Sequence, residues 1–129
     1  MNASTLYEYF ADSAYAGGGA LNGVWAHISS VLEQQHADGD VSFSTRIDIF
    51  LEVIRILLSD GRLLLSKNGK LLEGGVDEQI QSFRSSFPSS EPPVDENGGI
   101  FVWFFLGDCF GEAVWVYRLD DGSRHLEWT

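Results

Sequence analysis

The strongest helical signal in the chain is the segment STRIDIFLEVIRILLS, residues 44–59. Its apolar side chains recur at three- and four-residue spacing, which is typical of one face of a helix. This main stripe comprises Ile47, Phe50, Leu51, Ile54, Leu57 and Leu58. Ile49, Val53 and Ile56 widen it, so the helix must be covered on several sides. We predict that it is the central helix of the fold and that Asp60-Gly61 ends it.

Two helices are predicted before this segment. A capping-box pattern, Thr5 followed by Glu8, indicates that the first starts near residue 4 or 5. The run Gly17-Gly18-Gly19 ends it, because three glycines lose too much backbone entropy in a helix. The second helix spans about Leu21 to Gln35 by its apolar spacing, and the turn signal Asp38-Gly39-Asp40 follows it.

A hairpin, a fourth helix and a loop are predicted after the central helix. Residues 62–65 and 70–72 form a small hairpin, since Asn68-Gly69 supplies the positive φ angles of a tight turn. Helical spacing continues from about Val76 to Phe87, where Pro88 closes the helix. The polar segment SSEPPVDENGG, residues 89–99, is predicted to be an exposed loop within the domain.

The C-terminal part is predicted to be a β-meander. Residues 100–106 and 113–119 are aromatic and β-branched at successive positions, which favours strands buried on both faces. Residues 120–123 form a turn. Residues 124–128 alternate as a strand does, with Leu126 and Trp128 pointing one way and His125 and Glu127 the other. The fold class is therefore α+β, one domain over residues 1–129, with about four N-terminal helices and a small hairpin packed on a C-terminal antiparallel meander.

Charge is segregated along the chain, whose formal net charge is −11. Residues 1–40 carry five acids and no Lys or Arg, residues 41–88 carry six of each sign, and residues 89–129 carry eight acids and two arginines. A net negative field repels nucleic acid and anionic lipid and attracts basic protein. We therefore expect neither nucleic acid nor membrane as a partner. We also expect the two acidic ends to share one side of the fold.

Neither a cofactor nor a metal site is predicted. The glycine run lacks the preceding strand and the Lys of a phosphate loop, so we interpret it as a helix–helix turn. His36 with Asp38 and Asp40 matches no standard metal-ligand spacing. Cys109 is flanked by apolar residues and acids, which predicts a buried, unreactive thiol.

The cellular setting is expected to be the cytoplasm. A single cysteine cannot form an internal disulfide, and residues 1–5 resemble no signal peptide. No apolar run approaches the roughly 20 residues that span a bilayer.

The chain also resembles a family of short bacterial proteins of unassigned function. The resemblance covers most of residues 43–129. It is carried by the block FLEVIRILLSDGRL (50–63), by residues 71–74, 79–80 and 87–88, and by the tail at 101–105, 113–116 and 121–122. Members of that family are often encoded beside contact-dependent or filamentous-haemagglutinin-type toxins. The resemblance implies an immunity-like role and assigns no functional residue.

We predict a non-enzymatic protein-binding module, an immunity protein that neutralises a basic, nuclease-type toxin. An acidic inhibitor can steer to such a toxin and occlude its phosphate-binding groove. The alternatives are a small enzyme of unknown substrate and a homo-oligomeric accessory protein that uses its aromatic strands; the oligomeric state stays open. The predicted partner-binding residues are Glu91, Asp95, Glu96, Asp108, Glu112, Asp120 and Asp121.

Overall fold

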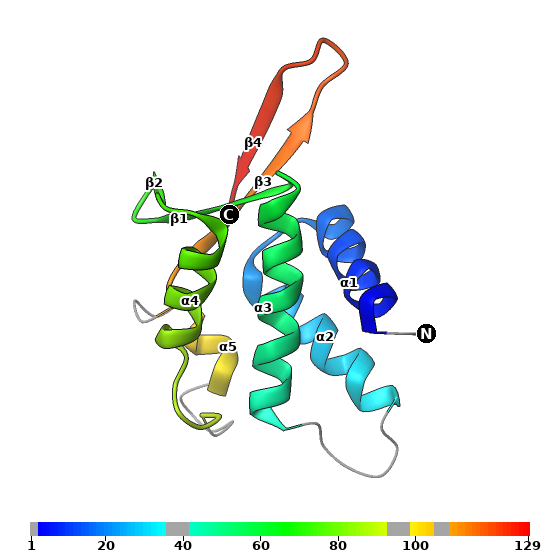
Figure 1. Ribbon diagram of the computed structural model, residues 1–129, viewed down its shortest axis with the longest axis vertical. Coiled ribbons are helices and arrows are strands. Elements are labelled where there is room, and N and C mark those ends of the chain that lie inside the picture. The colour runs from blue at the N-terminus through cyan, green and yellow to red at the C-terminus, as the bar shows by residue number, and fades with distance from the viewer. Residues whose placement is uncertain (1–2, 36–41, 93–98, 105–108) are drawn as a thin grey trace.

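The computed structural model describes residues 3–35, 42–92, 99–104 and 109–129. Its elements in chain order are α1 (Ala3–Gly17), α2 (Leu21–Gln35), α3 (Phe43–Ser59), β1 (Leu63–Lys67), β2 (Lys70–Leu71), α4 (Val76–Ser86), α5 (Gly99–Trp103), β3 (Glu112–Arg118) and β4 (Arg124–Trp128). Figure 1 shows the helices gathered around α3, with the sheet across one end of them. The predicted α+β class is confirmed.

Helix α3 is central, as its wide apolar stripe predicts. It packs against α1, α2, α4 and β1. Phe50, Val53, Ile54 and Leu57 are completely buried. The helix begins one residue earlier than predicted because Ser42 caps it, accepting a hydrogen bond from the Thr45 N–H at 3.1 Å.

The glycine run between α1 and α2 is a packed turn, with φ of 62° at Gly18 and 84° at Gly19. The Trp115 indole Nε1 donates a 2.8 Å hydrogen bond to the carbonyl of Gly19. A Cβ at Gly18 would lie 3.2 Å from the Tyr117 hydroxyl. The glycines therefore end α1 and also let the turn dock closely on β3.

The four strands form one antiparallel sheet in the order β2-β1-β3-β4. The β1–β2 hairpin turns at Asn68 and Gly69, with φ of 54° and 80°, which confirms the predicted tight turn. β1 pairs along its length with β3, so the small hairpin belongs to the same sheet as the C-terminal strands.

One predicted strand is wrong. Residues 99–103 form helix α5, while residues 105 and 106 lie outside the described part of the chain. Aromatic and β-branched residues favour strands only where their packing suits a sheet. Here Ile100, Trp103 and Phe104 share one helical face and are buried, with Trp103 stacked on Phe87 at 4.5 Å between ring centroids. Tertiary packing therefore overrides the local strand preference.

Helices α2 to α5 and the adjoining segments meet in an aromatic cluster. Phe50 lies at its centre and contacts Trp25, Phe83, Phe87 and Phe104, with ring centroids 5.6 to 6.0 Å apart. Most of these contacts are edge-on, the geometry that aromatic quadrupoles favour. We use the name aromatic cluster for Trp25, Phe43, Phe50, Phe83, Phe87, Trp103, Phe104 and Phe110.

The two faces of the sheet differ. Leu63, Leu65 and Trp115 belong to the main hydrophobic core, so their face of the sheet meets the helices. Side chains alternate along a strand, and Val114 and Val116 therefore lie on the opposite, outer face. Both valines are buried, which confirms that β3 is covered on both sides, but they stand apart from the main core.

Candidate protein-binding surface

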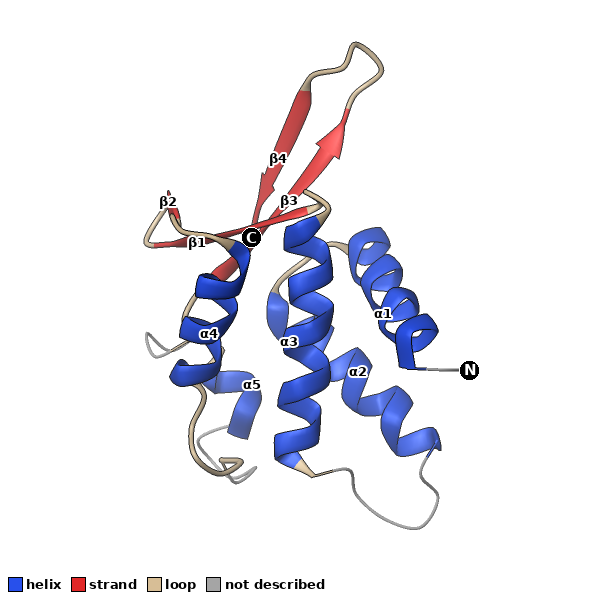
Figure 2. Ribbon diagram, in the orientation of Figure 1, coloured by secondary structure: helices blue, strands red, loops and turns tan. Residues whose placement is uncertain are grey.

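The β3–β4 hairpin projects beyond the helices, and its tip, residues 119–123, is the part farthest from them (Figure 2). The Leu119 N–H donates to the Ser123 carbonyl and the Gly122 N–H to the Leu119 carbonyl, each at 2.9 Å. Gly122 has φ of 86°, as a three-residue hairpin loop requires. The predicted turn is confirmed, and it holds Asp120 and Asp121 exposed at the hairpin tip.

A local hydrogen-bond pattern fixes the Asp121 carboxylate. Its Oδ1 accepts from the Ser123 hydroxyl at 2.5 Å and from the Ser123 N–H at 2.9 Å. These bonds favour the charged form, the hydroxyl bond most strongly, and hold the pKa of Asp121 below its usual value. The hairpin tip therefore keeps a negative charge into mildly acidic solution.

Glu91 is engaged within the molecule. Arg46 of α3 donates from both terminal nitrogens to the two carboxylate oxygens of Glu91, forming a bidentate ion pair. The same guanidinium lies 5.6 Å from the Trp25 ring centroid. Glu91 thus fastens the segment after α4 to the start of α3 and the aromatic cluster.

The other predicted contact residues are dispersed. Glu112 is exposed at the start of β3, far along the strand from the hairpin tip, and lines a cavity of about 170 Å³ with Ala20 and Thr129. Asp95, Glu96 and Asp108 lie outside the described residues. In Figure 1 the segment after α4 and the hairpin tip stand at opposite ends of the molecule. Glu91 therefore stands apart from Asp120 and Asp121, so the described acids of residues 89–129 do not gather on one side of the fold, as the expectation that both acidic ends share one side requires.

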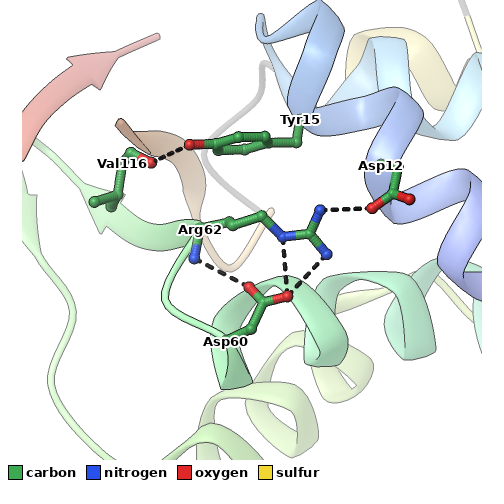
Figure 3. A network of polar contacts seen from close by, with 5 residues as sticks. All are labelled: Asp12, Tyr15, Asp60, Arg62 and Val116. Carbon is green, nitrogen blue, oxygen red and sulfur yellow. Dashed lines mark hydrogen bonds and ion pairs between the residues drawn. The ribbon is translucent and has the colours of Figure 1, made fainter. Parts of the chain in front are cut away.

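Arg62 joins the helices to the sheet, and sequence analysis missed it. Figure 3 shows its guanidinium between two carboxylates, bound to Asp12 of α1 at 2.8 Å and to Asp60 after α3 at 2.8 and 2.9 Å. It also lies 5.5 Å from the Tyr15 ring centroid. The Asp60 and Asp12 bonds raise the pKa of Arg62. Tyr15 in turn donates a 2.7 Å hydrogen bond to the Val116 carbonyl of β3.

These ion pairs change how the charge segregation is understood. Arginines of the balanced middle segment bind acids of both end segments, Asp12 through Arg62 and Glu91 through Arg46. Arg55 and Arg84 bind Glu52 and Asp48 within the middle segment. The arginines of the middle segment are therefore engaged inside the molecule. The exposed acids of the hairpin tip make no ion pair within the described residues.

Nucleophilic and metal sites are weakly supported. Cys109 is buried, and desolvation raises the pKa of its thiol to about 11, so the reactive thiolate is scarce at neutral pH. Ser13 Oγ lies 3.3 Å from His27 Nε2 beside a cavity of about 210 Å³, but no described carboxylate orients the imidazole. No three His, Cys, Asp or Glu side chains of the described segments gather around a common point. His36, Asp38 and Asp40 fall outside those segments.

Comparison with known proteins places the chain in a family. The model of a family described as "Protein of unknown function, DUF596" matches residues 58–129, more than half of the chain. The chain belongs to the DUF596 family. The match covers β1 to β4 with α4 and α5, and it begins inside α3. No curated protein matches.

A solved structure shares the DUF596 chain's fold. It is described as an uncharacterised protein conserved in bacteria, from Neisseria meningitidis. The TM-score is 0.73 at 22% sequence identity, over 95% of this chain and 88% of the other. At this identity the similarity establishes the fold alone.

Along the described helices, none combines the length and apolarity needed to cross a membrane.

Proposed function

We propose that the protein is a non-enzymatic binding module for a basic protein and that it acts as an immunity protein against a nuclease-type toxin. The observation that carries the proposal is the hairpin tip. It projects from the body, exposes Asp120 and Asp121, and leaves both without an ion pair among the described residues. The net charge of −11 adds a field of the same sign.

Physical chemistry supports a basic partner. A nuclease must carry positive charge to hold phosphates. An acidic binder is steered to that charge and gains association rate more than intrinsic affinity. The immunity role rests on the resemblance of residues 43–129 to proteins encoded beside toxins. A protein in that role would act in the cytoplasm.

The proposed contact surface is centred on the hairpin tip. Asp120 and Asp121 are its core, and Glu112, Asp95, Glu96 and Asp108 stay as further predicted contacts. Glu91 contributes through the fold, because its bond to Arg46 positions the segment before residues 95 and 96. The cavities give little support to the alternative that the protein is a small enzyme, because the Ser13–His27 pair has no orienting acid in the described segments.

The direct test is co-expression with the product of the neighbouring gene, which the proposal expects to be a toxin domain, followed by association kinetics across a salt series. Steering between exposed charges fades beyond a Debye length of roughly 8 Å at physiological ionic strength. We expect the association rate to fall as salt rises while the dissociation rate changes little. The double substitution Asp120→Asn with Asp121→Asn should slow association further. The amide introduced by Asp121→Asn keeps an oxygen that can accept the Ser123 N–H.

A matched control removes the same charge elsewhere. Glu8→Gln with Glu33→Gln changes two exposed acids on α1 and α2 and leaves the hairpin tip intact. We expect this control to slow association less than the tip variant does. Equal effects of the two variants would show that the net charge of the protein, and not the hairpin tip, accelerates association. A tight complex indifferent to salt and to both variants would overturn the acidic tip as the contact surface.

A further inference from the structure

β4 is an exposed edge strand. It is the last strand of the sheet, with β3 on one side and no strand of the described chain on the other. Arg124, His125, Glu127 and Trp128 are exposed, and Leu126 is half-buried. An exposed edge presents unpaired N–H and C=O groups and is a template for pairing with another strand.

The hydrogen bonds around β4 show which of its backbone groups are free. The Leu119 N–H donates to the Ser123 carbonyl, one pair beyond Arg118–Arg124 in the register. Bonded and non-bonded pairs alternate along an antiparallel ladder, so His125 and Glu127 direct their backbone groups toward β3. The Val116 N–H donates to the backbone carbonyl of Arg62, on the opposite side of β3, which agrees with this pattern. Arg124, Leu126 and Trp128 therefore point their backbone groups at the open edge.

The sequence of β4 is complementary to itself when reversed. In an antiparallel pairing of two β4 strands centred on Leu126, Leu126 opposes the partner's Leu126. The three residues whose backbone groups point at the open edge then all form hydrogen-bonded pairs. Arg124 then opposes the partner's Trp128, and His125 opposes the partner's Glu127. We propose that two copies of this chain associate through β4 in this register and join their sheets edge to edge. This interface is separate from the proposed partner-binding tip.

The side chains on the outer face favour this register. Arg118 and Arg124 stand directly opposite each other, and neither has an ion-pair partner among the described residues. Like charges in this position are destabilising. Trp128 is 47% exposed, and a guanidinium over an indole face is attracted to it. The partner's Trp128 thus gives Arg124 a favourable neighbour, and the aliphatic stem of Arg124 covers exposed indole.

The opposite face carries a polar pair. His125 and Glu127 alternate with Leu126, so they lie on the other side of β4 and meet their counterparts twice across the symmetric interface. An imidazole N–H can donate a hydrogen bond to a carboxylate directly opposite it, so histidine and glutamate form a favourable cross-strand pair. A register shifted by one residue would place Trp128 opposite His125. It would lose both the Arg124–Trp128 pair and the His125–Glu127 pair, so the side chains also select the register.

The arrangement leaves the acidic tips free. Because the two β4 strands run in opposite directions, the two hairpin tips point to opposite ends of the joined sheet. The pair would therefore present two separate acidic surfaces. A strand of a different protein added to β4 is the competing occupant, and the experiments below distinguish it.

Sedimentation equilibrium of the purified full chain tests the association. We expect a dimer at micromolar to millimolar concentration. Trp128→Lys places a cation opposite Arg124 twice in the symmetric interface and should raise the dimer dissociation constant by about tenfold or more, since exposed aromatic anchors dominate interfaces. The matched control is Leu119→Lys, which changes an exposed apolar residue of the hairpin tip outside β4 and should leave the dimer intact. Circular dichroism confirms that both variants fold.

Cysteine cross-linking tests the register. Cα atoms of a hydrogen-bonded antiparallel pair are about 5.5 Å apart, within the range of a disulfide. Leu126→Cys should therefore give a covalent dimer on mild oxidation. Arg124→Cys should not, because the two substituted positions lie roughly 13 Å apart along the strands. The native Cys109 is buried and does not compete.

Each contrary result overturns the proposal. A wild-type chain that stays monomeric to millimolar concentration excludes self-association through β4. A dimer that survives Trp128→Lys, or one that Arg124→Cys traps and Leu126→Cys does not, excludes this register. A monomer that loses a toxin partner on Trp128→Lys assigns the edge to a strand of that partner instead.

Discussion

The aromatic cluster and the distal half of the β3–β4 hairpin are held in place by different interactions. In the cluster, Phe50 is completely buried and touches four other aromatic rings. In the hairpin, Leu119 is 50% exposed and the neighbouring residues are held mainly by local hydrogen bonds. The first region stabilises the fold through packing, while the second presents backbone edge and charge to other molecules. The contrast predicts that stability and binding can be changed separately.

The largest effect is expected from Phe50→Ala in the aromatic cluster. Removing a fully buried phenylalanine loses apolar burial and leaves a cavity, which costs about 3–5 kcal/mol in the free energy of unfolding. The matched change in the hairpin, Leu119→Ala, should cost less than about 0.5 kcal/mol, as surface substitutions do. Urea denaturation of both variants measures the difference. Equal losses would show that the hairpin tip is part of the same cooperative core.

The second effect tests the connection between the two regions, which runs through Arg62. Arg62→Met keeps most of the side-chain length but removes the bonds to Asp12 and Asp60, and a hydrogen bond to a charged group contributes about 1.5–3 kcal/mol. With 24% of the Arg62 side chain exposed, screening reduces this, and we expect a loss of about 1–2 kcal/mol. Arg84→Met breaks the more exposed pair with Asp48 and should cost under about 0.5 kcal/mol. Urea denaturation of the two variants compares them, and equal losses would mean that Arg62 does not join the helices to the sheet.

Much of the fold was predictable from the sequence, because its signals are local. Four helices carry apolar stripes at helical spacing, glycines end α1, and Asn68-Gly69 makes the tight turn that the structure contains. Helix α5 was not predictable in this way. Its residues prefer strands in isolation, and only contacts such as Trp103 on Phe87, distant in the sequence, make the helix favourable.

The surface was less predictable for the same reason. Charge counts indicated an acidic C-terminal segment, but they could not show that Glu91 is held by Arg46, 45 residues earlier in the chain. The i, i+3 spacing of Asp12 and Tyr15 placed them on one helical face, the available hint of the Arg62 network. Alternation along residues 124–128 predicted a strand, and the strand order shows that it lies at the edge of the sheet. Its free backbone groups became identifiable only once the β3–β4 register was known.

Cys109 tests burial beside the aromatic cluster, just before β3. Desolvation raises the pKa of its thiol from 9.0 to about 11. Because the folded-state pKa is raised, this contribution to stability is complete below pH 9 and is lost as the pH rises toward 11. At about pH 8, below both pKa values, we expect alkylation by iodoacetamide to be slow in the native state and fast in urea. Fast native alkylation would mean that this segment opens easily.

The smallest effect belongs to the hairpin tip and tests whether its geometry is fixed without a core. The pKa of Asp121 is lowered because the Ser123 hydroxyl and N–H donate to the charged carboxylate. That stabilisation is present above the usual carboxyl pKa and is lost as the pH falls through the lowered one. Ser123→Ala removes the hydroxyl donor, so the pKa of Asp121 should rise toward its ordinary value, as NMR titration of the side-chain carboxyl carbon would show. The free energy of unfolding should change little, because the site is at the surface. If the pKa does not move, the Asp121 carboxylate samples many positions in solution. The acidic tip would then have to become ordered on binding, which would weaken its claim to be a preformed contact surface.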